Sequence, residues 1–414
     1  MRKSMPRICV LLCTCLLSIS VFSQTSWKGT VSTLWSNPLN WTNGVPDITK
    51  DAILGDANFT GINQPKINVA SVCKNIIVGG TVATNLSMTR NLSVNGNFTI
   101  QPNATITHPS SSITLYGNWI NHGTYTTTAT GARVIFAGTT QSIGGSVLTT
   151  FRRVTIAASS VTSLASNVSI DGASCLFDVT GTVDPGMSPT YTLTNTGATK
   201  FNSGSTLKIN AATFTGNYIL TGTTTFYGGS VTDYSSTVTN QTISSAYSYS
   251  TLKISGTGTK SLAANLPLLY GKNATSGNIL VTSGTFDIGT YTCNRATNVV
   301  GGEINVSNGA LLKTSGLSNF PINFATKTFG VSSTVEYYGA VQNISAQTYG
   351  NLLISAAGVK TAATAFSVAG NLTMTDGTLN TNATVVTHSI AGNFIMSGSS
   401  ALTGTASTYQ LNGT

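Results

Sequence analysis

Carboxylates are the side chains that would give this sequence polysaccharide-cleaving chemistry, and they are few. The chain holds eleven Asp and Glu residues in 414. Glycoside hydrolysis needs two carboxyl groups at a fixed separation. No Asp-Asp, Asp-x-Asp or Asp-His step occurs, and the nearest trio in the body of the chain is Asp171, Asp178 and Asp184. We therefore predict no catalytic residue and a non-enzymatic protein, although stacking of the chain would be able to unite distant acids.

A second acidic group, Asp47, Asp51 and Asp56, offers oxygen ligands of the kind that calcium prefers. The alternative is that these residues form turns, and we favour it, so that no metal site is predicted. The histidines show no ligand-like spacing, and we expect them to be exposed or to lie in a cap: His108, His122 and His388.

Three of the four tryptophans lie close together near the start, at Trp27, Trp35 and Trp41. Indole rings stack on sugars, which makes these residues the candidate carbohydrate contacts. Tryptophan also buries a large apolar area, and we favour packing within a cap. No cofactor is expected.

The first 23 residues have the pattern of a secretory signal peptide. Arg2, Lys3 and Arg7 precede a largely apolar run over 8–21, and Val21 and Ser23 are the small residues of a cleavage site. The run is shorter than the about 20 apolar residues of a membrane-spanning helix. We predict a secreted, extracellular or cell-surface protein without a transmembrane segment. Three cysteines remain after residue 23 and are expected to be buried apolar residues: Cys73, Cys175 and Cys293.

The composition excludes two classes of protein. Charged residues make up 7% and hydrophobic residues 40% of the chain, which is not the composition of a disordered protein. The formal charge is +9, but the cations are scattered and no basic cluster is interleaved with aromatics. We therefore predict no nucleic-acid partner.

A short repeat indicates coils of 21–22 residues. It reads apolar-x-apolar-x-Gly-Asn-apolar and recurs at Gly96-Asn97, Gly117-Asn118, Gly370-Asn371 and Gly392-Asn393. Two inward residues on a strand followed by a corner form one coil, and Gly and Asn both tolerate the left-handed backbone that a sharp corner can require. Asn side chains on successive coils are expected to form ladders.

A longer repeat of about 100 residues combines an apolar-x-aromatic-x-Gly segment with Gln-x-Ile and then apolar-x-Ile. The Gln residues are Gln141, Gln241 and Gln342. In the second copy we assign the aromatic and glycine to Phe226 and Gly228, with an insertion before the glutamine. The segment 409–414 resembles the start of a fourth copy, and we expect the sequence to be a fragment truncated within that copy.

These patterns predict an all-β fold, a right-handed parallel β-helix, with residues 24–80 as a Trp-rich cap and first coils and residues 81–414 as the repeats. Alternating apolar residues bounded by Gly, Asn, Ser and Asp indicate strands throughout. Tandem β-sandwich modules are the alternative.

The N-terminal motifs resemble those of a family. Trp35-Ser36-Asn37, Asn40-Trp41 and Asp51-Ala52-Ile53 are similar to the start of bacterial secreted, adhesin-like or autotransporter-type right-handed β-helix proteins, some of which use type IX secretion. The resemblance covers the mature chain and concerns architecture. It implies a surface protein whose partners are surface glycans or other cell-surface proteins. The alternative function is a carbohydrate-binding or polysaccharide-degrading β-helix protein.

Overall fold

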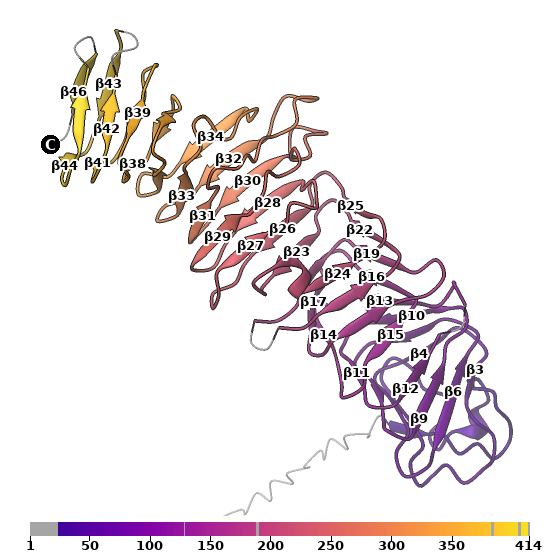
Figure 1. Ribbon diagram of the computed structural model, residues 1–414. Helices are drawn as coiled ribbons and strands as arrows, with labels where there is room; N and C mark the ends of the chain where they lie inside the picture. Colours follow the sequence, from indigo (N-terminus) through magenta and orange to yellow (C-terminus); the bar gives the residue numbers. More distant parts are fainter. Residues whose placement is uncertain (1–23, 128, 188–189, 382–384, 405–406, 413–414) are drawn as a thin grey trace, which may run out of the picture.

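The structure is a computed structural model that describes residues 24–127, 129–187, 190–381, 385–404 and 407–412. Within these residues the chain is a parallel β-solenoid of about 16 turns, seen in Figure 1 as a rod of stacked strands. The described part holds no α-helix and two 3₁₀ turns, η1 (Pro38–Asn40) and η2 (Phe214–Gly216). The all-β, parallel prediction is confirmed. Tandem β-sandwiches are excluded, because their strands pair antiparallel whereas the sheets here are parallel.

One sheet runs along most of the rod. Sheet A has fourteen strands in the order β1 (Gln24–Ser26), β2 (Asp51–Leu54), β5 (Ile76–Val78), β8 (Phe98–Ile100), β11 (Trp119–Asn121), β14 (Thr140–Gly144), β17 (Val161–Leu164), β20 (Thr182–Asp184), β23 (Thr206–Ile209), β26 (Val231–Tyr234), β28 (Thr251–Ile254), β30 (Asn278–Val281), β32 (Glu303–Val306) and β34 (Thr326–Phe329).

Three shorter sheets complete the N-terminal coils. Sheet D consists of β4 (Ser71–Cys73), β7 (Leu92–Val94), β10 (Ser112–Leu115), β13 (Arg133–Phe136), β16 (Arg153–Ile156), β19 (Leu176–Val179), β22 (Ala198–Phe201) and β25 (Thr224–Phe226). Sheet C consists of β3 (Lys66–Ile67), β6 (Thr84–Met88), β9 (Ala104–Thr107) and β12 (Thr124–Thr126). Sheet E consists of β15 (Thr149–Phe151), β18 (Val168–Ile170), β21 (Leu193–Asn195) and β24 (Tyr218–Leu220).

Three further sheets form the C-terminal coils. Sheet F consists of β27 (Gln241–Ile243), β29 (Thr259–Leu262), β31 (Thr285–Asp287), β33 (Leu311–Thr314), β35 (Thr334–Tyr337), β38 (Asn351–Ile354), β41 (Leu372–Met374) and β44 (Phe394–Met396). Sheet H consists of β36 (Gln342–Asn343), β39 (Val359–Thr361), β42 (Thr378–Asn380) and β45 (Ala401–Thr403). Sheet I consists of β37 (Thr348–Tyr349), β40 (Ser367–Val368), β43 (Thr387–Ile390) and β46 (Thr408–Leu411).

The core is a column of inward side chains, because every second residue of a strand points to the same side. Stacked strands place similar residues over one another, as where the Phe98 ring lies on the Trp119 ring with centroids 4.8 Å apart. All three described cysteines are buried and free, as expected for small apolar residues.

Asparagines at successive corners form the predicted ladder. Each bond runs from a backbone N–H to an asparagine side chain, and not between two side chains. The side-chain oxygen of Asn75 accepts the backbone N–H of Asn97 (2.7 Å), and the side-chain oxygen of Asn97 accepts that of Asn118 (2.8 Å). The glycines are not left-handed, which corrects our reason for them. A Cβ on Gly117 would lie 2.4 Å from the carbonyl carbon of Gly96, so glycine is needed because successive corners stack closely.

Coil length varies more than the short repeat implies. Stacked Cα partners are 21 residues apart at Leu115 and Phe136. They are 27 apart at Ile254 and Val281 and 17 apart at Tyr337 and Ile354. Loops outside the stacked strands absorb the difference.

The second long repeat begins at Tyr234, so our assignment to Phe226 and Gly228 was wrong. The side chain of Gln241 accepts the N–H of Ser236, just as Gln141 and Gln342 accept those of Gly138 and Gly339. The aromatic residue of each long repeat stands two positions before the donor: Phe136, Tyr234 and Tyr337. Ser236 replaces the glycine, which hid this copy.

Each long repeat starts on a different sheet. The first starts on β13 of sheet D, the second on β26 of sheet A and the third on β35 of sheet F. The length of a long repeat is therefore not a whole number of coils. Successive repeats start on different sides of the rod. Tyr409 lies on β46 of sheet I, and residues 413–414 are outside the described residues, so a fourth copy stays a prediction.

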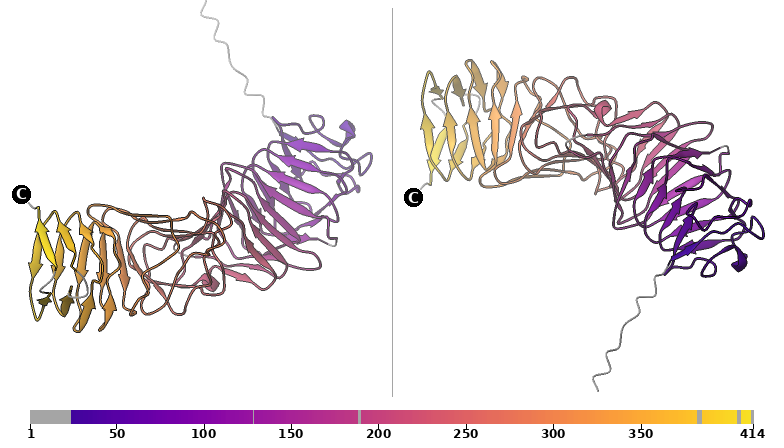
Figure 2. Two further views of the ribbon diagram at one scale, coloured as in Figure 1. Left: turned by 90° about the horizontal axis from the view of Figure 1, so that it is seen from above. Right: turned by 90° about the horizontal axis from the view of Figure 1, so that it is seen from below.

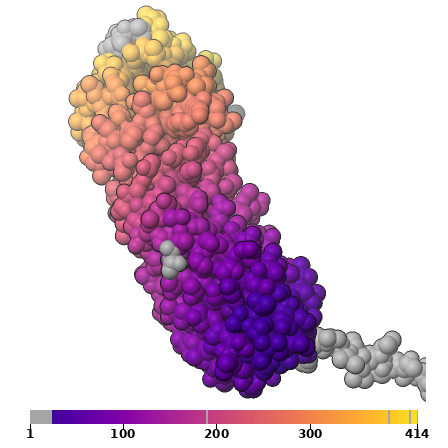
Figure 3. Space-filling model, turned by 90° about the vertical axis from the view of Figure 1, so that its right-hand side faces the viewer, coloured from indigo at the N-terminus to yellow at the C-terminus, as the bar shows by residue number. Residues whose placement is uncertain are grey.

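The rod is elongated and bent. Figure 2 shows that the N-terminal and C-terminal coils stack along different directions, and Figure 3 shows the rod from its side. The bend lies in the pink stretch, where sheets D and E end and sheet F begins. The predicted signal peptide, residues 1–23, lies outside the described residues.

Candidate functional site

The acids considered for catalysis pair with the neighbouring coil. Asp184 forms an ion pair with Lys208 at 2.9 Å, and Asp233 forms one with Lys253 at 2.9 Å. Lys208 and Asp233 are register partners on β23 and β26. Four consecutive strands of sheet A thus carry charges of alternating sign, and this arrangement links coils rather than presenting two free carboxylates to a substrate.

The other two members of the trio have the same role. Asp178 accepts a hydrogen bond from the Asn202 amide at 2.8 Å, and Asp171 accepts one from the Thr196 hydroxyl at 2.6 Å. The structure therefore does not bring Asp171, Asp178 and Asp184 onto one site. Each carboxylate serves a separate contact between coils.

The N-terminal acids hold turns and edges. The Asp47 carboxylate accepts both the hydroxyl and the backbone N–H of Thr49, and these bonds lower its pKa to about 2. Asp51 binds Asn75 on the next coil, and Asp56 accepts the Ser26 hydroxyl at 2.6 Å. Among the described residues no three His, Cys, Asp or Glu side chains converge in a way that could hold a metal ion.

Two of the histidines are core residues, which differs from our expectation of exposed or capping rings. His108 is fully buried, its Nδ1 lies 2.7 Å from the Tyr125 hydroxyl, and burial lowers its pKa to about 4. His388 is also buried, between Phe366 and Tyr409, and burial lowers its pKa. Only His122 lies near the surface, with its Nδ1 2.8 Å from the Ser146 hydroxyl.

The tryptophan group is a packed cap. Trp27, Trp35 and Trp41 are exposed by 0%, 0% and 1%, so no ring face is open to a sugar. The Trp41 ring meets both of the others edge to face, at 5.1 and 4.7 Å. Large indoles close the end of the core, because a solenoid's terminal coil has no neighbour to cover it. The candidate role of these three residues in carbohydrate contact is thus corrected: they pack the cap.

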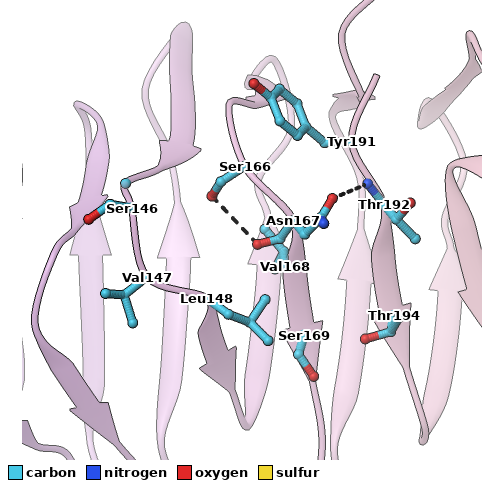
Figure 4. A pocket seen from close by; sticks show the side chains of 11 residues that line it. Ser146, Val147, Leu148, Ser166, Asn167, Val168, Ser169, Tyr191, Thr192 and Thr194 are labelled. Atoms are coloured by element: carbon cyan, nitrogen blue, oxygen red, sulfur yellow. Dashed lines mark hydrogen bonds between the residues drawn. The ribbon is translucent and has the colours of Figure 1, made fainter. Parts of the chain in front are cut away.

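A surface groove on sheet E is a better candidate for binding. It has a volume of about 580 Å³ and crosses the coils of β15, β18 and β21. Figure 4 shows Val147 and Leu148 on one side, Tyr191 above, and Ser169 and Thr194 below. Leu148 is 57% exposed. This volume lies in the range of small-molecule sites.

The groove keeps its shape because the coils are bonded to each other beneath it. The side-chain oxygen of Asn167 accepts the backbone N–H of Thr192 at 3.0 Å, which ties one coil to the next. Its lining combines apolar carbons with hydroxyl and amide groups and contains no charged side chain. Such a lining can contact the apolar face of a neutral sugar and bond to its hydroxyls.

Sequence reasoning missed this groove because its residues come from separate coils. Val147, Ser169 and Thr194 are more than twenty residues apart along the chain, and none belongs to a motif. The adjacent apolar residues Val147 and Leu148, in the segment before β15, were the only signal that the sequence offered.

In comparisons with known proteins, no family model, no curated protein and no solved structure matches the chain. No helix in the described part of the chain is long and apolar enough to cross a membrane.

Proposed function

We propose that this chain is a non-enzymatic, extracellular, adhesin-like structural protein whose solenoid holds a contact surface away from its base. The observation that carries the proposal is the unbroken fourteen-stranded sheet A. About 16 turns at about 4.8 Å per strand make a rod on the order of 75 Å long. A continuous hydrogen-bonded sheet resists shear along such a rod.

The leader pattern in residues 1–23 supports an extracellular place for this rod. The resemblance of the N-terminal motifs to bacterial secreted β-helix proteins supports the same setting. Its surface chemistry is mainly that of hydroxyls and amides, since only 7% of the residues are charged. Hydroxyl and amide surfaces exchange hydrogen bonds with glycans and with other neutral surfaces.

Carbohydrate binding is the second candidate, and the groove on sheet E favours it. The groove joins exposed apolar side chains to polar groups that can bond to sugar hydroxyls. Glycans and cell-surface proteins are therefore the partners that we propose. Polysaccharide cleavage receives less support, because the acids named above bind lysines, amides or hydroxyls of neighbouring coils.

Beads that display residues 24–414 test the adhesive function. We expect them to adhere under flow to surfaces coated with polysaccharide or cell-surface protein, and beads that display an unrelated protein of equal charge to wash off. Equal retention of both kinds of bead would refute adhesion.

A parallel assay tests the non-enzymatic part of the proposal. Soluble protein is incubated with neutral and acidic polysaccharides, with and without calcium, and the products are assayed for new reducing ends and unsaturated uronates. We expect neither product. Their release by wild type, and its loss in Asp184→Asn, would show that the chain cleaves polysaccharides.

A further inference from the structure

A second groove lies where sheet D ends. The last strand of that sheet is β25, and residues 244–250 of the next coil form no strand. The missing strand leaves a recess of about 300 Å³. We call it the tyrosine groove, because Tyr227, Tyr247, Tyr270 and Lys272 are among the residues that line it.

The core behind the groove holds the Tyr247 ring and the Tyr270 backbone in place. Tyr247 packs on Phe214 and Phe226, with ring centroids 4.7 and 5.6 Å apart. The backbone N–H of Tyr270 donates to the Tyr249 carbonyl at 2.7 Å. Tyr227 follows β25 directly and is 41% exposed. The Tyr247 ring is thus fixed before any ligand arrives, which reduces the entropy lost on binding.

The polar ends of these side chains are not engaged. The three phenol hydroxyls and the Lys272 ammonium make no hydrogen bond or ion pair with another described residue. By contrast, Lys313, whose ammonium lies 4.6 Å from the centre of the Tyr338 ring, and Tyr338 itself both have acidic partners. Lys313 bonds to Glu336 at 3.1 Å, and Tyr338 donates to Asp287 at 2.7 Å.

The tyrosine groove has no such acid in its lining. A ligand with a negative charge would give Lys272 the kind of partner that Glu336 gives Lys313. It would also have to accept or donate hydrogen bonds at the phenols and lie against their rings. A pyranose that carries a carboxylate meets all three requirements, and the volume is at the small end of the range for ligand sites, which suits one or two sugar rings.

We propose that the tyrosine groove binds an acidic sugar, with Lys272 pairing with its carboxylate and Tyr227 lying against its ring. This deepens the proposed adhesive function and rests on it. The recess is a pocket at the end of a sheet, and its aromatic lining gives rigid contact area at little entropic cost.

Calorimetric titration of residues 24–414 with trigalacturonate, and with its methyl ester as a neutral counterpart, tests the proposal. We expect the acid to bind at least tenfold more tightly than the ester. Lys272→Gln should lower the affinity for the acid to that for the ester, and Tyr227→Ala should weaken both by about tenfold. Equal binding of acid and ester, unchanged binding by either variant, or no binding at all would overturn it.

Matched controls separate a site from general charge attraction. Lys66→Gln and Tyr116→Ala change an exposed lysine and an exposed tyrosine on other coils, and we expect wild-type affinity from both. If they weaken binding as much as the groove variants do, the attraction is not local and the proposal fails.

The bead assay distinguishes this proposal from the proposed function. Adhesion that persists in Tyr227→Ala and is not inhibited by trigalacturonate would refute the groove and leave adhesion standing. Binding of trigalacturonate in solution by beads that adhere to nothing would refute adhesion and leave the groove standing.

Discussion

The phenol oxygens of Tyr337 and Tyr349 lie 3.0 Å apart inside the solenoid. Ser345 closes the contact: its N–H donates to Tyr337, and its carbonyl accepts the Tyr349 hydroxyl. The pair thus satisfies backbone groups of a half-buried corner. Tyr234 and Tyr249 repeat the contact at 3.0 Å in the preceding repeat.

The first long repeat solves the same packing problem without hydroxyls. Phe136 and Phe151 lie edge to face with centroids 6.1 Å apart, and Tyr337 and Tyr349 lie edge to face at 6.5 Å. The ring geometry is therefore common to the repeats, and the hydroxyls are an addition that serves the corner.

We expect Tyr349→Phe to lower the free energy of unfolding by about 1–3 kcal/mol, because the Ser345 carbonyl and the Tyr337 hydroxyl each lose a partner in the core. Urea denaturation measures the loss. Tyr227→Phe removes an exposed hydroxyl and should change stability by less than about 0.5 kcal/mol.

The double variant Tyr337→Phe/Tyr349→Phe makes the prediction specific to the pair. Because the two hydroxyls bond to each other, its loss should be smaller than the sum of the single losses. Strictly additive losses would mean that the two hydroxyls act independently.

Stability should fall on mild acidification through His108. Burial places its folded-state pKa at about 4, below the 6.5 of an unperturbed histidine. The unfolded chain therefore takes up the proton first, so stability is full above pH 6.5 and is lost as the pH falls from 6.5 towards 4. The loss amounts to about 3 kcal/mol, and burial of His388 acts in the same direction.

Denaturation curves between pH 7 and 4.5 for wild type, His108→Gln and His122→Gln check this. The range lies above 3.8, the ordinary pKa of an aspartate, and the stabilisation by Asp47 is lost only as the pH falls from there towards its folded-state pKa of about 2. We expect a flatter profile for His108→Gln and a wild-type profile for His122→Gln. An equally steep profile for His108→Gln would assign the pH dependence to other groups.

The alternating charges on sheet A, Asp184, Lys208, Asp233 and Lys253, should contribute to stability where they are buried. The Asp233 side chain is 4% exposed and bonds to Lys253 and to the Ser255 hydroxyl. We expect Asp233→Ala to cost about 2–3 kcal/mol, since hydrogen bonds to charged groups are among the stronger ones. Asp47→Ala removes an exposed pair with Lys50 and two exposed hydrogen bonds from Thr49, and it should cost less than about 1 kcal/mol. Similar losses for both variants, measured by thermal denaturation, would contradict a role for burial.

Close stacking of the corners predicts a large effect of one methyl group. In Gly117→Ala the new Cβ would collide with the Gly96 backbone, and we expect a loss of about 1–3 kcal/mol. Gly131→Ala is the matched control, because its Cβ would meet nothing closer than 3.2 Å. A Gly117→Ala variant as stable as Gly131→Ala would show that the coils can separate at this corner.

The sequence by itself determined the architecture, because local and repeated patterns of residues specify the solenoid. Alternating apolar residues mark the strands, and the spacing from Gly96 to Gly117 equals one coil. The three repeated glutamines could also be read directly. Tertiary contact was needed to align Tyr234 with Phe136 and Tyr337, since a serine stands in place of the glycine in that copy.

Which side chains are buried and which line a groove was decided only by the tertiary structure. Trp27, Trp35 and Trp41 have the side chains of a sugar site, yet the end of the core needs a cover and buries them. The tyrosine groove joins residues 227, 247 and 270 because one sheet ends and leaves a recess. Spacing along the chain shows which residues recur from coil to coil. A groove depends on where a strand is missing beside its neighbour, and only the stacking of the coils decides that.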